Sequence, residues 1–151
     1  MKSVVQRVRE ASVTVEGEAV GSIDAGILVL LGVERGDSEQ DAIVLATKLA
    51  GLRIFPGERP MDRSLADIEG SALVVSQFTL AASVRKGRRP GFDRAEDPTR
   101  AEQLYGSFCA ALRKLGVPVQ TGRFGAHMDV RLLNDGPVTL LVDCRDGAIV
   151  G

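Results

Sequence analysis

Hydrophobic and polar residues in the first fifth of the chain follow patterns that β-strands require. Residues 4–15 are rich in β-branched side chains, with apolar and polar positions alternating at their end. The glycine-containing segment 16–18 predicts a hairpin turn into a second strand at 19–23. Residues 27–31 form a continuous apolar run, which is typical of a strand buried on both faces. This part of the chain therefore predicts three strands.

Two later segments have the spacing of apolar residues that an amphipathic helix requires. The first begins after Ser38, which can accept a hydrogen bond from an early backbone N–H group, and stops near Gly51. The second begins at Asp97-Pro98, a capping carboxylate followed by proline at the first helical position, and Gly116 closes it. The predicted buried stripes are Ala42, Leu45, Ala46 and Leu49 in the first helix, and Leu104, Phe108, Ala111, Leu112 and Leu115 in the second.

Further apolar runs predict strands, and a polar segment at 61–70 is expected to be irregular. The elements do not alternate in a repeated βαβ rhythm, and no repeat or linker divides the chain. We therefore predict an α+β fold over residues 1–151: a single compact domain with a curved, antiparallel-rich sheet or β-barrel backed by two helices. The further predicted strands are 52–55, 72–80, 117–121, 130–133 and 138–142.

Composition and charge narrow the classes of function. The hydrophobic content of 44% and charged content of 26% are those of an ordinary soluble globular protein. The most apolar segment, 26–33, is too short to cross a bilayer, and the first residues lack the apolar run of a signal peptide. We expect a cytoplasmic protein without a membrane partner. A net charge of −1 argues against a protein that grips long DNA or RNA duplexes, so any nucleic-acid contact should be local, at an end.

The scarcity of histidine and cysteine counts against two common kinds of site. His127 is the only histidine, whereas zinc sites and Ser-His-Asp sites both depend on histidine or several cysteines. Cys109 and Cys144 lie far apart in apolar patterns and are expected to be buried hydrophobic residues. We predict no metal and no cofactor.

A polar insert interrupts the strand predicted at 72–80. If the strand continues, Ser76 and Phe78 share one face while Gln77 and Thr79 share the other. Polar groups at the end of a buried strand, just before a basic loop, are well placed to line a pocket. Equally, Thr79 could be present only because threonine favours strands, and Gln77 could point to solvent.

Three further features each have a structural and a functional interpretation. The segment Asn134-Asp135-Gly136-Pro137 is either an edge-strand turn or a cis Gly-Pro bond that aims a backbone carbonyl; the rarity of cis bonds favours the turn. The basic loop 85–91, with Arg85, Lys86, Arg88 and Arg89, either holds a phosphate or forms a solvated rim. Arg7 lies among apolar strand residues, either as packing or as a placed hydrogen-bond donor.

Together, these residues give the chain a resemblance to the D-aminoacyl-tRNA deacylases over nearly its whole length. The segments SQFTL and NDGPVT are the most specific part of it. The chain differs from the family at Asp62, at 81–84 and at His127, which affects the pocket rim and tRNA contacts. The matching segments, in family order, are 5–8, 11–13, 52–55, 76–80, 86–87, 89–90, 121–122, 124–125 and 134–139.

The resemblance implies a homodimer in which each active site takes Ser76, Gln77, Phe78 and Thr79 from one subunit and a cis Gly136-Pro137 pair from the other. The resemblance therefore predicts a cis Gly136-Pro137 bond, in place of the turn that the rarity of cis bonds favours. Arg7 would help to hold the Gly-Pro pair, with Asn134 in support. The tRNA would be bound by Lys86, Arg88 and Arg89 of the basic loop.

The implied reaction is hydrolysis of the ester of D-aminoacyl-tRNA at its 3′ end, a quality-control step in translation. Backbone N–H groups near Phe78 and Thr79 would stabilise the oxyanion, and the 2′-hydroxyl of the terminal adenosine would assist; Thr79 as nucleophile is the other candidate. Gly136-Pro137 would exclude L-amino acids by main-chain contact, so glycyl-tRNA should be accepted in part. Two alternatives stay open: a non-catalytic tRNA 3′-end binding module and a small-molecule esterase that uses Thr79.

Overall fold

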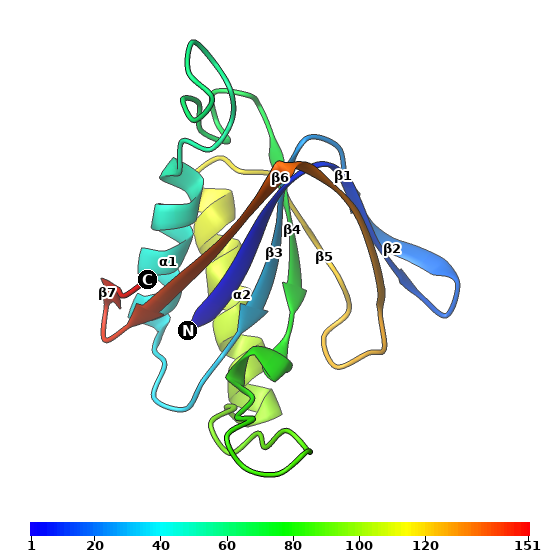
Figure 1. Ribbon diagram of the computed structural model, residues 1–151, viewed down its shortest axis with the longest axis vertical. Coiled ribbons are helices and arrows are strands. Elements are labelled where there is room, and N and C mark those ends of the chain that lie inside the picture. The colour runs from blue at the N-terminus through cyan, green and yellow to red at the C-terminus, as the bar shows by residue number, and fades with distance from the viewer.

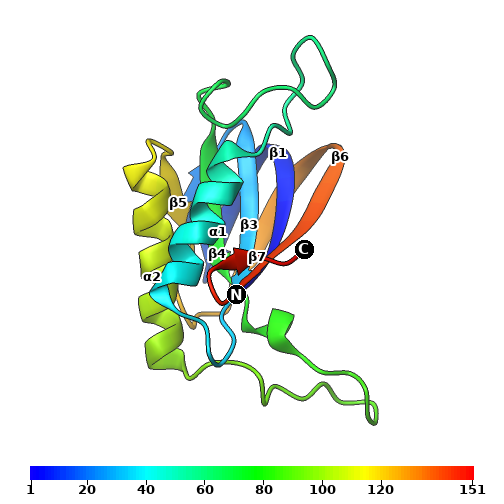
Figure 2. The same cartoon turned by 90° about the vertical axis from the view of Figure 1, so that its left-hand side faces the viewer.

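The computed structural model describes residues 1–151, which form a curled mixed sheet with both long helices on one face (Figures 1 and 2). The strand order is β5-β4-β3-β1-β6-β7, and β2 pairs with β1. Strand β1 is antiparallel to β2, β3 and β6, whereas β3, β4 and β5 are parallel. The predicted α+β class is confirmed. The strands are β1 (Lys2–Val15), β2 (Glu18–Ile23), β3 (Gly26–Gly32), β4 (Ser71–Ser76), β5 (Val119–Thr121), β6 (Asp129–Arg145) and β7 (Ala148–Ile149).

The curl of the sheet divides the apolar side chains into two clusters. The larger cluster of 25 buried residues lies between the sheet and the helices. A smaller cluster of seven, which includes Val13, Leu28 and Leu73, lies on the opposite face of the sheet. Strand β3 contributes to both clusters, which explains the continuous apolar run at 27–31. Neither long helix combines the length and the hydrophobicity that a membrane-spanning helix needs.

Helix α1 (Glu39–Gly51) begins as predicted. The Ser38 hydroxyl accepts a hydrogen bond from the backbone N–H of Asp41 at 3.3 Å, and the Asp41 carboxylate accepts one from the backbone N–H of Ser38 at 2.8 Å. Burial acts to raise the pKa of Asp41, but hydrogen bonds from Gly147 and Ser38 outweigh it and lower the pKa below its ordinary value. The predicted stripe of four residues is buried.

Helix α2 (Pro98–Lys114) also begins as predicted, because the Asp97 carboxylate accepts from the backbone N–H groups of Thr99 and Arg100. Four of its five predicted stripe residues are buried. Leu115 is the exception: it is 47% exposed, because it follows the last helical residue and no longer lies on the buried face.

Two strand predictions were wrong. Residues 52–55 form no strand; only Phe55 makes an isolated bridge, to Arg63. Strand β4 stops at Ser76, and residues Phe78–Ala81 form the short 3-10 helix η1 instead. Side chains of a 3-10 helix do not alternate, so the predicted sharing of faces by residues 76–79 was also wrong.

The segment 134–137 is not a turn between two strands. Strand β6 runs through it without interruption, and its pairing with β1 shifts register between Gln6 and Val8 and again between Val8 and Glu10. The additional β6 residues bulge opposite Arg7. A local Asp-Gly-Pro pattern favours a turn, but the long pairing with β1 decides the structure here.

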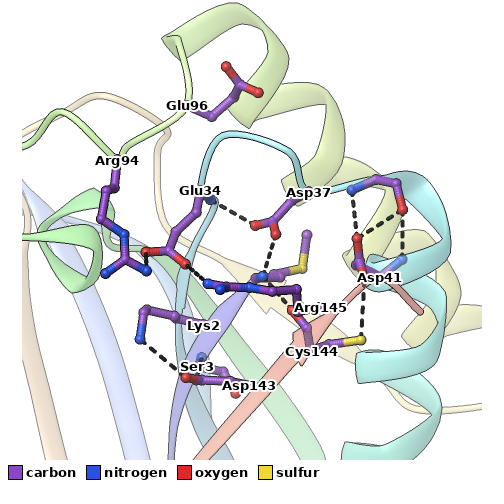
Figure 3. Close-up of polar contacts among 12 residues, drawn as sticks. Lys2, Ser3, Glu34, Asp37, Asp41, Arg94, Glu96, Asp143, Cys144 and Arg145 are labelled. Carbon is purple, nitrogen blue, oxygen red and sulfur yellow. Dashed lines mark hydrogen bonds and ion pairs between the residues drawn. The ribbon is translucent and has the colours of Figure 1, made fainter. Parts of the chain in front are cut away.

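A buried polar network joins the starts of β1 and α1 to the end of β6 (Figure 3). The amino group of Met1 donates to the Asp37 carboxylate at 2.5 Å and to the carbonyl of Cys144 at 2.6 Å. Burial raises the pKa of Asp37 above its ordinary value, although the Met1 ammonium and the N–H of Glu34 act to lower it.

Candidate functional site

A cavity of about 460 Å³ lies where β4 gives way to η1. Three separate parts of the chain form its walls: the end of β4 with the start of η1, the segment leading into α2, and the loop before β6. Most of the lining is apolar. The residues that matter most for its chemistry are Ser76, Gln77, Phe78, Ala95, Glu96, Phe124, His127 and Met128.

The segment 76–79 is held by its backbone. The N–H of Gln77 donates to the carbonyl of Leu31 at 2.8 Å, which continues the pairing of β4 with β3 by one residue. The side-chain amide of Gln77 donates to Oγ1 of Thr79 at 2.5 Å. The N–H groups of Phe78 and Thr79 lie in the first turn of η1, where a helix supplies no acceptor and no side chain caps them. They are donors available to a ligand.

The basic loop is attached to this site. Backbone hydrogen bonds in both directions between Ser83 and Gly91, at 2.8 and 2.9 Å, close the loop into a hairpin. Immediately after it, Phe92 packs against Phe78 with ring centroids 5.0 Å apart. The side chains of Lys86, Arg88 and Arg89 are exposed and form no ion pair.

Gly136 and Pro137 lie in the β6 bulge, joined by a cis peptide bond. Arg7, which is 8% exposed, donates from Nε to the carbonyl of Asp135 at 2.9 Å and from Nη1 to the carbonyl of Ile54 at 2.7 Å. Arg7 is therefore a placed donor and not merely packing. A methyl group added to Gly136 would lie 3.0 Å from the second terminal nitrogen of Arg7.

Asn134 fixes the same bulge from the other side. Its side-chain amide donates to the carbonyl of Arg7 at 2.9 Å and to the carbonyl of Val138 at 3.0 Å. The two residues predicted to support the Gly-Pro pair thus contact the backbone on both flanks of it. Glycine is required at 136 because its φ is 138°, a conformation that L side chains rarely adopt.

Within one chain, the bulge and the segment 76–79 lie at opposite ends of the sheet. Ser76 is in register with Leu31, and Leu31 with Ser3, whereas Arg7 pairs four residues farther along β1, with Ile27. Four residues of strand span about 13 Å. Figure 1 shows the same separation: the bend of β6 lies at the top of the sheet and η1, in green, at the bottom.

The cysteines and the only histidine differ in their exposure to solvent. Cys109 and Cys144 are buried as predicted, and burial raises the pKa of each thiol to about 11. His127 lines the cavity but is 95% exposed, with Nε2 3.8 Å from Asp129. No group of three or more His, Cys, Asp or Glu side chains is arranged to hold a metal ion.

The sequence pointed to one wall of the cavity, the segment that contains Ser76, Gln77 and Phe78. It did not indicate that the segment before α2 and the loop before β6 form the other walls. Ala95 and Glu96 had no sequence signal, because they precede a helix in an ordinary polar segment. Phe124 was noted only within a family-like segment, and Met128 not at all. Their positions depend on how the chain after β5 returns across the sheet, which no local pattern encodes.

The chain is similar to known proteins over nearly its whole length. The family model for D-Tyr-tRNA(Tyr) deacylase matches residues 4–143. The D-aminoacyl-tRNA deacylase of Thermomicrobium roseum is 59% identical over 97% of this chain and 96% of its own length. That of Thermus aquaticus is 58% identical over 97% of each chain.

Two solved structures share the fold. The c-Myc DNA unwinding element binding protein superimposes with a TM-score of 0.89 at 43% identity, over 95% of this chain and 98% of that one. A probable eukaryotic D-amino acid tRNA deacylase superimposes with a TM-score of 0.80 at 21% identity, over 94% and 98%. The chain therefore belongs to the D-Tyr-tRNA(Tyr) deacylase family, whose enzymes are hydrolases of carboxylic ester bonds.

Proposed function

We propose that this protein is a D-aminoacyl-tRNA deacylase, which hydrolyses the ester between a D-amino acid and the 3′ end of tRNA in the cytoplasm. The observation that carries the proposal is the cavity lined by Ser76, Gln77 and Phe78, at the point where η1 begins with the N–H groups of Phe78 and Thr79 uncapped. Family membership supplies the reaction class. Free amino acid and free tRNA are the products.

The backbone donors of η1 suit the chemistry of ester hydrolysis. Water attacks the carbonyl carbon, the bond to the ribose oxygen breaks, and that oxygen takes a proton. Negative charge develops on the carbonyl oxygen during the attack. The N–H groups of Phe78 and Thr79 would stabilise this charge, and one such donor is worth about 2.7–4 kcal/mol.

In this proposal the substrate itself, and not a side chain, assists the attack on the ester. Oγ1 of Thr79 contacts the amide of Gln77, which cannot accept its proton. We infer that the 2′-hydroxyl of the terminal adenosine assists the attack. Thr79→Ala should then keep most of the deacylation rate, whereas near-complete loss in single-turnover assays would favour Thr79 as the nucleophile.

The rest of the site suits the end of an RNA strand. The apolar cavity can enclose a nucleoside, and the exposed Lys86, Arg88 and Arg89 can contact phosphates along the strand as it leaves. Because these contacts are few, tRNA binding should depend only modestly on salt. Simultaneous replacement of the three residues by alanine should raise KM with little change in kcat.

We propose further that the protein acts as a homodimer whose sites are shared between subunits. Within one chain the bulge at Gly136 cannot reach the segment 76–79, because four residues of strand separate their register positions. A second copy could bring its bulge to the cavity. Strand β6 offers a surface for this: it lies near the sheet's edge, pairs with β7 only at Cys144 and Arg145, and exposes Leu133 by 49% and Leu141 by 71%.

Complementation between two defective chains tests the shared site. One chain carries Phe78→Pro, which removes a proposed donor, and the other carries a glycine inserted between Gly136 and Pro137. If sites are shared, half of randomly mixed dimers are mixed and each has one intact site, so activity returns to about a quarter of wild type. If both elements act within one chain, every site in the mixed dimer is defective and no activity returns.

Chirality would be sensed by main chain in this proposal. The enzyme must accept many side chains, so a side-chain pocket cannot reject L-amino acids. A stiff backbone beside Cα can, and thousandfold rejection requires roughly 4 kcal/mol. We assign this role to Gly136 and Pro137, held by Arg7 and Asn134. Glycine has no side chain to exclude, so glycyl-tRNA should be hydrolysed to some extent.

The central experiment compares substrates. The protein should release free amino acid from D-tyrosyl-tRNA and leave L-tyrosyl-tRNA intact. A non-catalytic binding module would bind the tRNA and release nothing. A general esterase would hydrolyse simple esters that lack the ribose 2′-hydroxyl.

A further inference from the structure

Glu34 is a buried carboxylate that lies between two arginines (Figure 3). It is 3% exposed and lies two residues after Gly32, the last residue of β3. Its Oε1 lies 2.8 Å from Nη2 of Arg94, and its Oε2 accepts a hydrogen bond from Nη2 of Arg145 at 3.1 Å. Oε1 forms no hydrogen bond of good geometry, so Arg94 is its only compensation. Loss of Arg94 would leave Oε1 buried without a polar partner, which is unfavourable even though Arg145 still pairs with Oε2.

Arg94 belongs to the segment that forms one wall of the cavity. The next two residues, Ala95 and Glu96, line the cavity directly. Backbone hydrogen bonds clamp this segment to the end of β3: the N–H of Arg35 donates to the carbonyl of Arg94 at 2.9 Å, and the N–H of Glu96 donates to the carbonyl of Val33 at 3.1 Å. Two side-chain contacts add to the same clamp: the ion pair of Arg94 with Glu34, and a hydrogen bond that Nε of Arg35 donates to the carbonyl of Ala95 at 3.2 Å.

Arg145 pairs with the other oxygen of Glu34 but has no connection to the cavity. It lies at the end of β6, beyond the residues that line the site. The two arginine side chains are similarly exposed, at 54% and 57%, in an open polar cleft of about 560 Å³. They are therefore a matched pair: each neutralises the same buried charge, and only Arg94 continues into the cavity wall.

We propose that the Glu34–Arg94 pair is a positioning contact that sets the cavity wall at Ala95 and Glu96 and so determines the affinity for the 3′-terminal nucleoside of the substrate. The nature of the ligand rests on the proposed function. The pair does not touch the reacting atoms. Its loss should weaken ground-state and transition-state binding equally, which raises KM and leaves kcat unchanged.

The test compares Arg94→Met with Arg145→Met in the full chain. Both remove one cation from Glu34 and keep an unbranched side chain, so both should lower the unfolding midpoint in urea by similar amounts. Only Arg94→Met should raise KM for D-tyrosyl-tRNA, by about tenfold or more, with kcat within about twofold of wild type. Arg94→Lys, which keeps the charge, should recover most of the affinity.

A second readout follows the wall itself. In hydrogen exchange, the amides of Arg35 and Glu96 should lose protection in Arg94→Met and keep it in Arg145→Met. Titration with adenosine 5′-monophosphate should show the same difference in affinity without any catalysis. Equal KM, exchange and nucleotide affinity in the two variants would overturn the positioning role. A wild-type protein that leaves D-tyrosyl-tRNA intact would instead refute the proposed function, while exchange and nucleotide binding would still decide the role of the pair.

Discussion

Replacing Gly136 by alanine adds one methyl group at the most constrained point of the β6 bulge. The added carbon would lie 2.9 Å from Cγ2 of Val138, 3.1 Å from its backbone nitrogen and 3.0 Å from a terminal nitrogen of Arg7. None of these neighbours moves easily. The nitrogen of Val138 is main chain, and Arg7 is fixed by hydrogen bonds to the carbonyls of Asp135 and Ile54.

The cost has two parts. A residue other than glycine at a φ of 138° is strained, at about 1–3 kcal/mol. The methyl group must also displace packed atoms, which costs about 1–3 kcal/mol more. We expect Gly136→Ala to lower the free energy of unfolding by about 2–6 kcal/mol in total.

Gly116→Ala is the matched control. Gly116 also has a positive φ, 82°, but a methyl group there meets no atom within 4 Å. It should cost only the backbone preference, about 1–2 kcal/mol. Urea denaturation of both variants gives the stability difference, and hydrolysis of D- and L-tyrosyl-tRNA gives the effect on the site. We expect Gly136→Ala alone to lose activity or chiral preference.

The reasoning would be refuted by a Gly136→Ala protein that is as stable as Gly116→Ala and keeps full preference for the D-substrate. That result would mean that the bulge yields freely, and that Arg7 does not hold it. If Gly136→Ala lowers the free energy of unfolding but leaves the preference for the D-substrate unchanged, the packing at the bulge is as described and the bulge has no part in chiral selection.

Three further predictions concern residues away from the cavity. Arg7→Lys keeps the charge but has a single donor nitrogen, which cannot occupy the positions of both Nε and Nη1, so urea denaturation should show a loss of about 1.5–3 kcal/mol; a loss below about 0.5 kcal/mol would contradict the contacts. The lowered pKa of Asp41 means that its ionised form stabilises the fold above the ordinary carboxyl pKa of 3.8, and that this contribution is lost as pH falls through the lower folded value. Asp41→Asn should therefore be destabilised at pH 7 and approach wild type below about pH 4 in thermal unfolding. Burial and thiol pKa values of about 11 should leave Cys109 and Cys144 unreactive to iodoacetamide at pH 8 in the folded protein, with both alkylated in urea; rapid alkylation of the folded chain would show local opening.

Where an element depends on neighbours in sequence, the sequence predicted it. The hairpin at 16–18, the cap at Ser38 and the Asp97-Pro98 opening are all local signals, and each element begins where its signal lies. The continuous apolar run of β3 also indicated burial on both faces. Such features need only a few residues, because capping and turn formation are short-range interactions.

Where distant residues compete with a local pattern, the sequence was misleading. The apolar run at 72–80 looks like one strand, but its pairing partner β3 ends at Gly32, and a methyl group at Gly32 would lie 2.9 Å from Leu80. Beyond Ser76, β4 has no further strand residue of β3 to pair with, and the chain forms η1. In the same way, the turn signal at 134–137 yields to pairing with β1, which carries β6 straight through.

The sequence alone thus determined the helices, most strands, the basic loop and the residues that carry the family resemblance. Which of them meet depends on the folded chain: Arg7 contacts the Gly136 bulge, Glu34 pairs with Arg94, and residues 76–78 form a cavity with walls from two other parts of the chain. The reason is physical. Local patterns indicate which backbone conformation a segment prefers. A cavity or a buried ion pair depends instead on residues that are distant in sequence, and only the packing of the whole sheet fixes their relative positions.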